Sequence, residues 1–485
     1  MRRSAFLAIA LATWSTQQSL PAQGRPGEAN EQTAVIETPA SVPVDDPSGE
    51  TTRVMVDWEK SSGTATPRSF SVAIFSAFKP EEAAFPKYIE NLRYMKLGVL
   101  RYHHAGLMSD SVERPNGWID VKNQSWDREK IRKALDALNS LPGERIINIP
   151  EWPEWMDQNK DRFLDEGQIA HFARLCAELV RIINVEQGRG FSFEITNELD
   201  GLYWLDLRKK GKPDRLEELA AIYNACAAAM REVDPNVRLG GPSFTRPDSA
   251  DDIRRFVRLT KHNLDFLSFH MYASGSPNDS DRAVFSKTDT MARYVRTIRQ
   301  IVDEESPDRP IELHCNEFNI SWTWKTRDVR MTNIKGAVFD ALALMAMKNA
   351  GLDVACAWNE RDGVYGKMDA DENLRAPAHV YHLMNTYMIG TIHPASSSRP
   401  IRVRAMAVSS DHSRSLMLVN WSSEPQRVDL SGAQPQSGQA LERIELSGDT
   451  PGRSIWPSAG TTELPAQSVT WLIAKPTGTP PEKSH

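Results

Sequence analysis

The segment FSFEITNELD, residues 191–200, has the character of a buried β-strand that ends in polar side chains. A helical pattern at 215–233 and a second apolar run at 237–242 follow it. A strand, a helix and a further strand in this order form the unit from which parallel sheets are built. The same alternation continues in both directions along the chain, which predicts a large α/β architecture.

Eight short β-like runs lie between residues 70 and 358, and a longer helical pattern follows each of them. The runs are residues 70–76, 99–103, 145–150, 191–197, 237–242, 265–272, 311–317 and 353–358. The helical patterns are residues 85–97, 126–141, 168–186, 215–233, 250–262, 291–305, 333–350 and 376–388. This repetition predicts a parallel sheet closed into a (β/α)8 TIM barrel. An open, doubly wound sheet is the alternative, but it usually has a glycine-rich turn after its first strand, which residues 75–78 lack.

The barrel is expected to occupy residues 69–391. Five short runs with strand character follow it, separated by Gly, Ser and Pro, and they predict a small antiparallel β-sandwich at 392–476. A strand within 51–68 is expected to join that sandwich.

The two ends of the chain have a different character. Residues 1–23 have a basic start, a short apolar run and a region of small residues, as an export signal does. Residues 24–50 are expected to form a disordered linker, and residues 477–485 a disordered tail. A periplasmic or extracellular location follows from the signal, and no later stretch is long and apolar enough for a membrane helix.

Composition excludes several classes of function. The chain has 485 residues, 58 basic and 64 acidic side chains, and a formal net charge of −6. This balance favours neither nucleic acid nor an anionic membrane as a partner. The four cysteines form no CxxC pair, so a disulfide framework and a zinc knuckle are not expected. The oligomeric state stays open.

Two glutamates mark the candidate active site. Glu198 ends the fourth run and Glu317 ends the seventh, so both belong to the barrel face where active sites lie. Two carboxyl groups that flank a cleft are what glycosidic bond cleavage requires. Glu360, after the eighth run, is a competitor for a catalytic role on position alone.

Other polar and aromatic side chains are expected at the same barrel face. Arg101 and His103 end the second run, His270 and Tyr272 the sixth, and Trp358 the eighth. Further aromatic residues crowd the loops predicted at this face, and together they favour a carbohydrate cleft, since flat rings pack on sugars. They are Trp118, Trp126, Trp152, Trp155, Tyr203, Trp204, Trp322, Trp324 and Tyr365.

The sequence gives less support to a metal-dependent enzyme or to an enzyme with a serine nucleophile. The chain has no HExxH motif and no GxSxG motif. His103 and His104 are adjacent, so they would point to opposite faces of a strand. No metal and no cofactor is expected, although a metal-dependent barrel hydrolase stays an alternative.

With these residues in view, the chain resembles glycoside hydrolase family 39, which belongs to a large clan of barrel-type retaining glycosidases. The family includes β-xylosidases, α-iduronidases and bacterial exopolysaccharide hydrolases. Residues 193–200 are similar to the family's F-E-x-W-N-E-P-N, and residues 316–321 to its T-E-[WYF]-N-x-S. Thr196 stands at the family's Trp, residues 199–200 at its Pro-Asn, and Asn316 at its Thr.

The resemblance implies a role for each matched residue. Glu198 would be the acid/base, Glu317 the nucleophile, and Asn197 a ligand of the sugar 2-hydroxyl. Arg101, His103, His270, Tyr272, Trp358, Trp322 and Asn319 are expected to bind substrate or support the two glutamates.

We therefore expect an exported retaining glycosidase acting on an oligo- or polysaccharide. A carbohydrate-binding pseudoenzyme is one alternative. A hydrolase of uronic-acid-containing glycans is another, suggested by the basic loop residues Arg246, Lys325, Arg327, Arg361 and Lys367.

Overall fold

A computed structural model of the chain describes residues 50–76, 78–79, 81–104, 106–109, 117–434, 439–456 and 460–476. The expected signal, nearly all of the expected linker and the expected tail lie outside the described residues. Within the described part of the chain, no helix has both the length and the apolar character that crossing a membrane requires.

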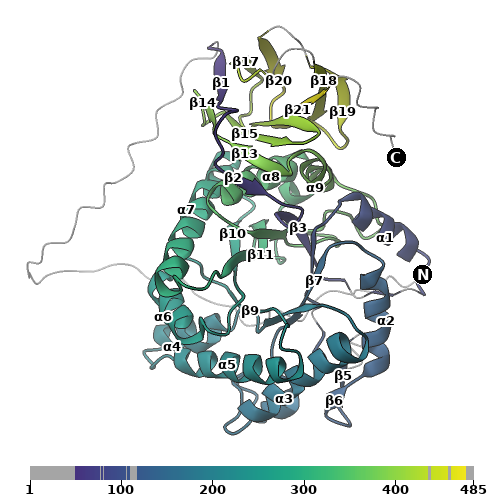
Figure 1. Ribbon diagram of the computed structural model, residues 1–485, viewed down its shortest axis with the longest axis vertical. Coiled ribbons are helices and arrows are strands. Elements are labelled where there is room, and N and C mark those ends of the chain that lie inside the picture. The colour runs from purple at the N-terminus through teal and green to yellow at the C-terminus, as the bar shows by residue number, and fades with distance from the viewer. Residues whose placement is uncertain are drawn as a thin grey trace, which may run out of the picture. The chain divides into compact units, whose positions relative to one another are not determined.

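Eight parallel strands close into a barrel, as the sequence predicts (Figure 1). Each overlaps one of the predicted runs, and the closure excludes the open, doubly wound sheet. In order around the barrel they are β10 (Phe266–Ser274), β11 (Glu312–Ser321), β12 (Val354–Ala357), β3 (Phe70–Ile74), β4 (Val99–Tyr102), β7 (Glu144–Ile149), β8 (Ser192–Ile195) and β9 (Leu239–Phe244).

Helices surround these strands (Figure 1). The predicted ones are α1 (Phe85–Tyr94), α2 (Arg128–Asn139), α3 (Ile169–Val180), α5 (Leu216–Val233), α6 (Ala250–Thr260), α7 (Asp281–Glu305), α8 (Ile334–Asn349) and α9 (Ala376–Tyr387). Helix α7 starts before the predicted residue 291, because the Ser280 hydroxyl accepts the N–H of Ala283 and caps a polar first part that has little apolar periodicity. Short elements fill the loops: β5 (Ile119–Asp120), β6 (Ser125–Trp126), α4 (Asp206–Lys209), 3-10 turns η1 (Glu154–Met156) and η4 (Val329–Thr332), and π-helical turns η2 (Arg181–Glu186) and η3 (Gly201–Leu205).

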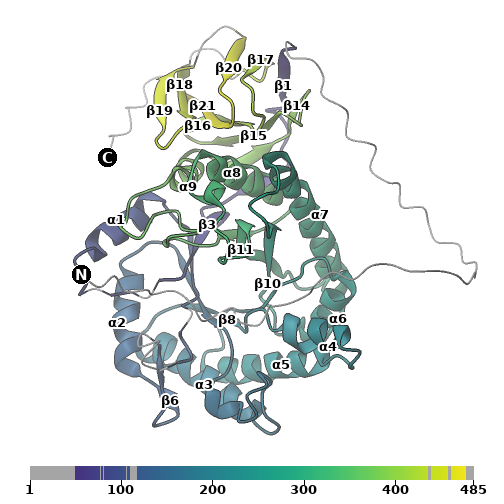
Figure 2. The same cartoon turned by 180° about the vertical axis from the view of Figure 1, so that it is seen from behind.

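Two sheets form the C-terminal sandwich. One contains β14 (Ala395–Ser397), β1 (Thr52–Val56), β17 (Gln426–Gly432) and β20 (Thr461–Leu464). The other contains β19 (Gly452–Ile455), β18 (Gln439–Leu446), β21 (Ser468–Pro476), β16 (Ser413–Asn420), β15 (Val403–Ser410), β13 (Gly390–His393) and β2 (Gly63–Ala65). Strand β1, from the start of the described chain, pairs antiparallel with β14 and parallel with β17. Helix α8 contacts β16 and β21, so barrel and sandwich share a packed boundary (Figure 2).

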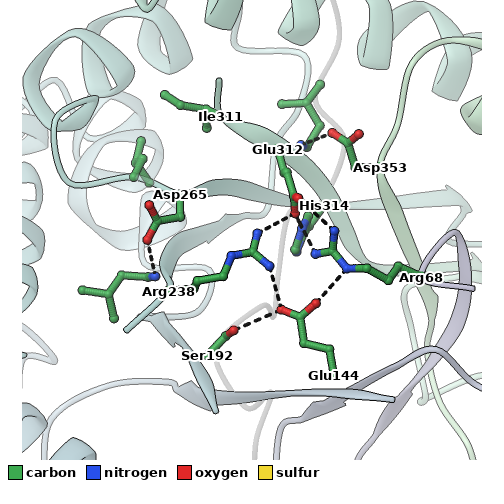
Figure 3. Close-up of polar contacts among 12 residues, drawn as sticks. Arg68, Glu144, Ser192, Arg238, Asp265, Ile311, Glu312, His314 and Asp353 are labelled. Atoms are coloured by element: carbon green, nitrogen blue, oxygen red, sulfur yellow. Dashed lines mark hydrogen bonds and ion pairs between the residues drawn. The ribbon is translucent and has the colours of Figure 1, made fainter. Parts of the chain in front are cut away.

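The base of the barrel is closed by a ring of alternating charges (Figure 3). Arg68 donates to Glu144 at 2.7 Å and to both carboxylate oxygens of Glu312 at 2.7 and 2.8 Å. Arg238 donates to the same two glutamates at 3.1 and 2.8 Å. Glu144 and Glu312 are the first residues of β7 and β11, so the ring lies at the end of the barrel opposite the expected active site.

Every second residue of a barrel strand faces the interior. These residues line the interior from the charged ring to the opposite end of the barrel. An apolar cluster above the ring includes Val99, Ile146 and Phe266. Two residues further along β4 comes Arg101, and two further along β7 comes Asn148. The interior therefore changes from apolar to charged as the strands approach their C-terminal ends.

Candidate active site

Arg101 is the centre of the polar network at the C-terminal end of the barrel. Its side chain is fully buried on β4. Nη1 donates to Oε1 of Glu317 at 3.0 Å, and Nη2 donates to Oδ1 of Asn197 at 2.8 Å. Nε donates to Oε2 of Glu194 at 2.7 Å. One guanidinium thus connects the turn after β8 with the middle of β11, the two segments that carry the glutamate motifs.

The chain turns sharply after β8 to present Asn197 and Glu198. Thr196 and Glu198 have φ values of 69° and 56°, in the left-handed region that side chains other than glycine rarely adopt. Each such residue costs about 1–3 kcal/mol, so surrounding bonds must hold it. The N–H of Asn197 donates to the carbonyl of Pro150, and that of Glu198 to the carbonyl of Ser243, at 2.9 and 3.0 Å.

A β-bulge places Glu317 on β11. His270 of β10 pairs with Glu317, whereas the preceding Phe269 pairs with Cys315, so Asn316 is the extra residue. Because of the bulge, the neighbours Asn316 and Glu317 both reach the Arg101 network. Strict alternation along the strand would have pointed them to opposite faces.

Glu198 and Glu317 lie close together across the barrel end. One carboxylate oxygen of each and a ring nitrogen of His270 lie within 4.8 Å of one another. Nδ1 of His270 is 2.8 Å from Oε1 of Glu198, and the Tyr272 hydroxyl donates to Oε2 of Glu317 at 2.7 Å. Among the described residues this is the only His, Cys, Asp and Glu group close enough to hold a metal ion, but the Arg101 charge beside it disfavours a cation.

The two glutamates have different environments. Burial raises the pKa of Glu198 to about 7, against the opposing charges of Arg101 and Arg162. Glu317 instead accepts hydrogen bonds from the guanidinium of Arg101 and the phenol of Tyr272, which hold its carboxylate in place. Burial, together with the charge of Glu317, raises the pKa of Tyr272, so its phenol stays protonated as a donor. The site thus combines a carboxyl group that holds its proton with one that two donors hold in place.

His103 and Trp358 form a wall beside this pair. The His103 ring lies 5.6 Å from that of Trp358, which also packs edge-on against Phe75 at 4.7 Å. Asn319, expected to bind substrate, is 1% exposed and donates to the main-chain carbonyl of Trp358, while its Oδ1 accepts the N–H of Ile320. These bonds hold the main chain at Trp358 and Ile320, and the expected contact of Asn319 with substrate stays a prediction.

Trp322 stands apart from the network. Its side chain is 56% exposed and covers Gly275 so closely that a Cβ on this glycine would lie 2.4 Å from the indole nitrogen. Most of the loop aromatics are buried, so their rings pack between loops, helices and barrel, and their expected role in a carbohydrate cleft stays a prediction. The buried ones are Trp118, Trp126, Trp152, Tyr203, Trp204 and Tyr365.

Glu360 is not a competitor for catalysis. It is fully buried, and its two oxygens accept the N–H groups of Phe75 and Ser76 at 2.9 Å each. The Tyr88 hydroxyl donates to it as well, at 3.0 Å. Its carboxylate thus holds the loop after β3.

Glu194, Asn148 and Asn316 belong to the network although the sequence analysis assigned them no role, even though Glu194 and Asn316 lie within the two matched motifs. Asn148 and Asn316 both donate to the carboxylate of Glu194, which is fully buried. A signal for Glu194 does exist in the sequence, since a charge in the middle of an apolar strand requires a buried partner. The sequence offers Arg101 for that role, also in the middle of an apolar strand.

Comparison with known proteins agrees with this geometry. Residues 163–366 match the family model of glycosyl hydrolases family 39, which confirms the resemblance inferred from the two glutamate motifs. Residues 400–472 match the C-terminal immunoglobulin-like domain of D-apionate lactonase.

The chain is also similar to individual proteins. A β-xylosidase of Geobacillus stearothermophilus is 26% identical over 176 residues, which are 34% of this chain and only 32% of that protein. A monomeric β-xylosidase of Caulobacter crescentus aligns over 88% of this chain and all of its own, with a TM-score of 0.65 and 17% identity. A family 51 arabinofuranosidase of Xanthomonas axonopodis pv. citri has the same coverage, a TM-score of 0.66 and 15% identity. At these identities the two structures support the fold alone.

Proposed function

We propose that this chain, a member of glycoside hydrolase family 39, is a retaining glycosidase that cleaves O-glycosidic bonds by double displacement. The observation that carries the proposal is the distance of at most 4.8 Å between a carboxylate oxygen of Glu198 and one of Glu317. Retaining pairs stand about 5–5.5 Å apart, whereas inverting pairs leave about 6.5–9.5 Å for a water molecule. The short separation therefore favours direct attack by a carboxylate on the sugar.

In the first step, Glu317 attacks the anomeric carbon. A bond forms between its carboxylate oxygen and this carbon while the glycosidic bond breaks, and Glu198 gives its proton to the leaving oxygen. The raised pKa of Glu198, about 7, supplies an acid that still holds its proton near neutral pH. Arg101 and Tyr272 keep Glu317 oriented before the attack.

In the second step, Glu198 acts as a base. Its carboxylate removes a proton from a water molecule, whose oxygen bonds to the anomeric carbon as the bond to Glu317 breaks. Both glutamates return to their starting states, and the sugar keeps its original configuration. No step requires a cofactor.

The identity of the sugar is best tested with a panel. Aryl β-xylosides and α-arabinofuranosides come first, because the similar proteins carry the names xylosidase and arabinofuranosidase. The anomeric configuration of the first product, read by proton NMR before mutarotation, should match that of the substrate. Inversion would contradict the mechanism.

Binding of oligosaccharides without turnover of any glycoside would favour the carbohydrate-binding pseudoenzyme. Loss of activity in the presence of a chelator would favour a metal-dependent hydrolase.

Acidic glycans are a second candidate substrate class, although three of the five basic loop residues that the sequence suggested already have acidic partners. Arg361 pairs with Glu372, Arg246 with Asp248, and the buried Lys367 with Asp340. Arg162 is the basic residue that favours this candidate. Its guanidinium has no ion-pair partner among the described residues. Its positive charge acts on the site, because it lowers the pKa of Glu198 against the effect of burial.

Asp157 fixes the loop that carries Arg162. Its carboxylate accepts the N–H groups of Asp161 and Arg162. If a substrate carboxylate binds there, Arg162→Gln should reduce turnover of aryl uronides and leave aryl xylosides unaffected. Xylosides cleaved far better than uronides by the wild type would contradict the acidic class.

Export is part of the proposal and is supported by the pattern of residues 1–23. Cell fractionation of a bacterium that expresses the full chain should recover the protein outside the cytoplasm. A variant without residues 1–23 should stay in the cytoplasm.

A further inference from the structure

Glu194 is a buried anion with no place in the double displacement itself. It is fully buried on β8, and every neighbour that contacts its carboxylate is a donor: Arg101 at 2.7 Å, Asn148 at 2.8 Å, and Asn316. Burial opposes its ionisation, but the Arg101 charge and hydrogen bonds from Ser268 and Ser243 outweigh burial and lower its pKa to about 2. A charge kept at this depth has a consequence for each group bound to it.

The first consequence concerns Arg101. Its Nε is bound to Glu194, which fixes the plane of the guanidinium. In that plane the two terminal nitrogens point at Glu317 and Asn197. Without the carboxylate of Glu194, the guanidinium loses the contact at Nε that fixes its plane, and its contacts with Glu317 and Asn197 should become less well aligned.

The second consequence concerns His103. Both amide hydrogens of Asn148 are used, one on Glu194 at 2.8 Å and one on the carbonyl of Thr196 at 3.0 Å. Its Oδ1, 2.6 Å from Nδ1 of His103, must therefore accept a hydrogen bond from the ring N–H at Nδ1. Burial, and then the Arg101 charge, lowers the pKa of His103 to about 3, so the ring is neutral and Nε2 carries no proton.

We propose that Glu194 is a positioning residue that orients Arg101 on the nucleophile and, through Asn148, keeps His103 as a hydrogen-bond acceptor for a sugar hydroxyl. The inference rests on the proposed glycosidase function for its kinetic effect, but not for its effect on the His103 tautomer.

Substitution of Glu194 by Gln removes the charge and nearly keeps the shape. The new side-chain NH2 group faces at least one of the donors Arg101, Asn148 and Asn316, so at least one of their hydrogen bonds to residue 194 must be lost or reversed. The Arg101 charge is then shared by fewer anions and acts more strongly on Glu317 and Glu198. Glu198 should therefore lose its proton at lower pH, because a stronger positive field opposes the burial that raises its pKa. The titratable or charged groups that surround the two glutamates are Arg101, His103, Arg162, Asp200, His270, Tyr272 and Tyr365.

The ring at the other end of the barrel supplies the matched control (Figure 3). Glu144 also accepts from an arginine at 2.7 Å and from neutral Ser192 at 3.0 Å. Glu144 is the first residue of β7, whereas Asn148, the β7 residue of the Arg101 network, lies near the other end of the strand. Glu144→Gln thus removes a partly buried, arginine-paired charge without touching the Arg101 network.

The test compares Glu194→Gln, Glu194→Asp and Glu144→Gln with the wild type by pH-dependent kcat and KM on an aryl glycoside. Glu194→Gln should lower kcat on the order of 10- to 100-fold and move the pH profile to lower pH by about one unit. Glu194→Asp keeps the charge, so its profile should stay at the wild-type pH with a reduced kcat. Glu144→Gln should leave both unchanged. An unshifted profile for folded Glu194→Gln, or the same shift in Glu144→Gln, would overturn the proposal.

Nitrogen-15 NMR of the histidine side chains tests the same proposal without any turnover. Wild-type His103 should be neutral and protonated on Nδ1, and Glu194→Gln should mix the two tautomers. A single, unchanged tautomer in the variant refutes the role of Glu194. If the wild type cleaves no glycoside, the proposed function fails, and this measurement alone then decides the role of Glu194.

Discussion

Nη1 of Arg101 lies 3.0 Å from Oε1 of Glu317, and the same guanidinium is bound to Glu194 through Nε at 2.7 Å. One buried cation therefore serves two anions, one of which is proposed to react and the other to stay in place. The arrangement explains how the proposed nucleophile is held beside Glu198, a carboxyl group that retains its proton up to a pH of about 7.

Glu317→Ala should abolish turnover, because no glycosyl-enzyme can form. Azide should restore part of the activity by entering the vacated space and attacking the sugar directly. A single displacement inverts the configuration, so the glycosyl azide should have the anomeric form opposite to the wild-type product, which NMR will show. Wild-type activity in Glu317→Ala, with activity lost in Glu360→Ala, would mean that the nucleophile is misassigned.

Glu198→Gln should affect substrates according to their leaving groups. An alkyl glycoside or an oligosaccharide needs a proton on the departing oxygen, whereas a nitrophenolate departs without one. We expect kcat/KM to fall on the order of 100-fold or more for the former and far less for the nitrophenyl substrate. Equal losses on both substrate types would assign Glu198 another role.

The activity of the wild type should decline as the pH rises through about 7, the pKa to which burial raises Glu198. The sign follows from the role: the free enzyme is active with Glu198 protonated, and protonation is lost above the pKa. A profile of kcat/KM against pH measures this limb. In Glu198→Gln, assayed with a nitrophenyl glycoside, the limb should disappear, and its persistence would show that another group titrates.

Glu312 should contribute to stability and not to catalysis. Hydrogen bonds from His314, Arg68 and Arg238 outweigh burial and hold the pKa of Glu312 well below its usual range. The pKa of Glu312 is lower in the folded than in the unfolded chain. Its contribution to the free energy of unfolding is therefore complete above the unfolded pKa and declines as the pH falls below that value. Glu312→Gln should lower the free energy of unfolding by about 1–3 kcal/mol at pH 7, with a smaller difference below about pH 4.

Urea unfolding at the two pH values measures this difference, and kcat per folded molecule should stay at the wild-type value. Glu129, whose ion pair with Arg132 lies on the surface of α2, is the control. Glu129→Gln should change the unfolding free energy much less, because surface pairs are screened by water. A larger effect at Glu129 than at Glu312 would contradict the structural role of the ring.

The sequence by itself determined the barrel, the sandwich and the position of the two catalytic candidates. Runs such as 191–197 and the helix pattern at 215–233 carry their periodicity within a few residues, so the alternation of strand and helix is local information. A glutamate at the end of a parallel strand also has its barrel face fixed by strand direction alone. Glu198 and Glu317 could therefore be assigned to the same face before any contact was known.

Only the tertiary structure decided which polar residues join the network. Asn316 belongs to it because of a bulge in β11. Glu194 belongs to it because Arg101 on β4 can reach the carboxylate on β8. Glu360 follows a strand as Glu198 does, yet its carboxylate is consumed by the N–H groups of the β3 loop. Side-chain direction and partners depend on register and on strands far apart in the sequence, and no local pattern contains that information.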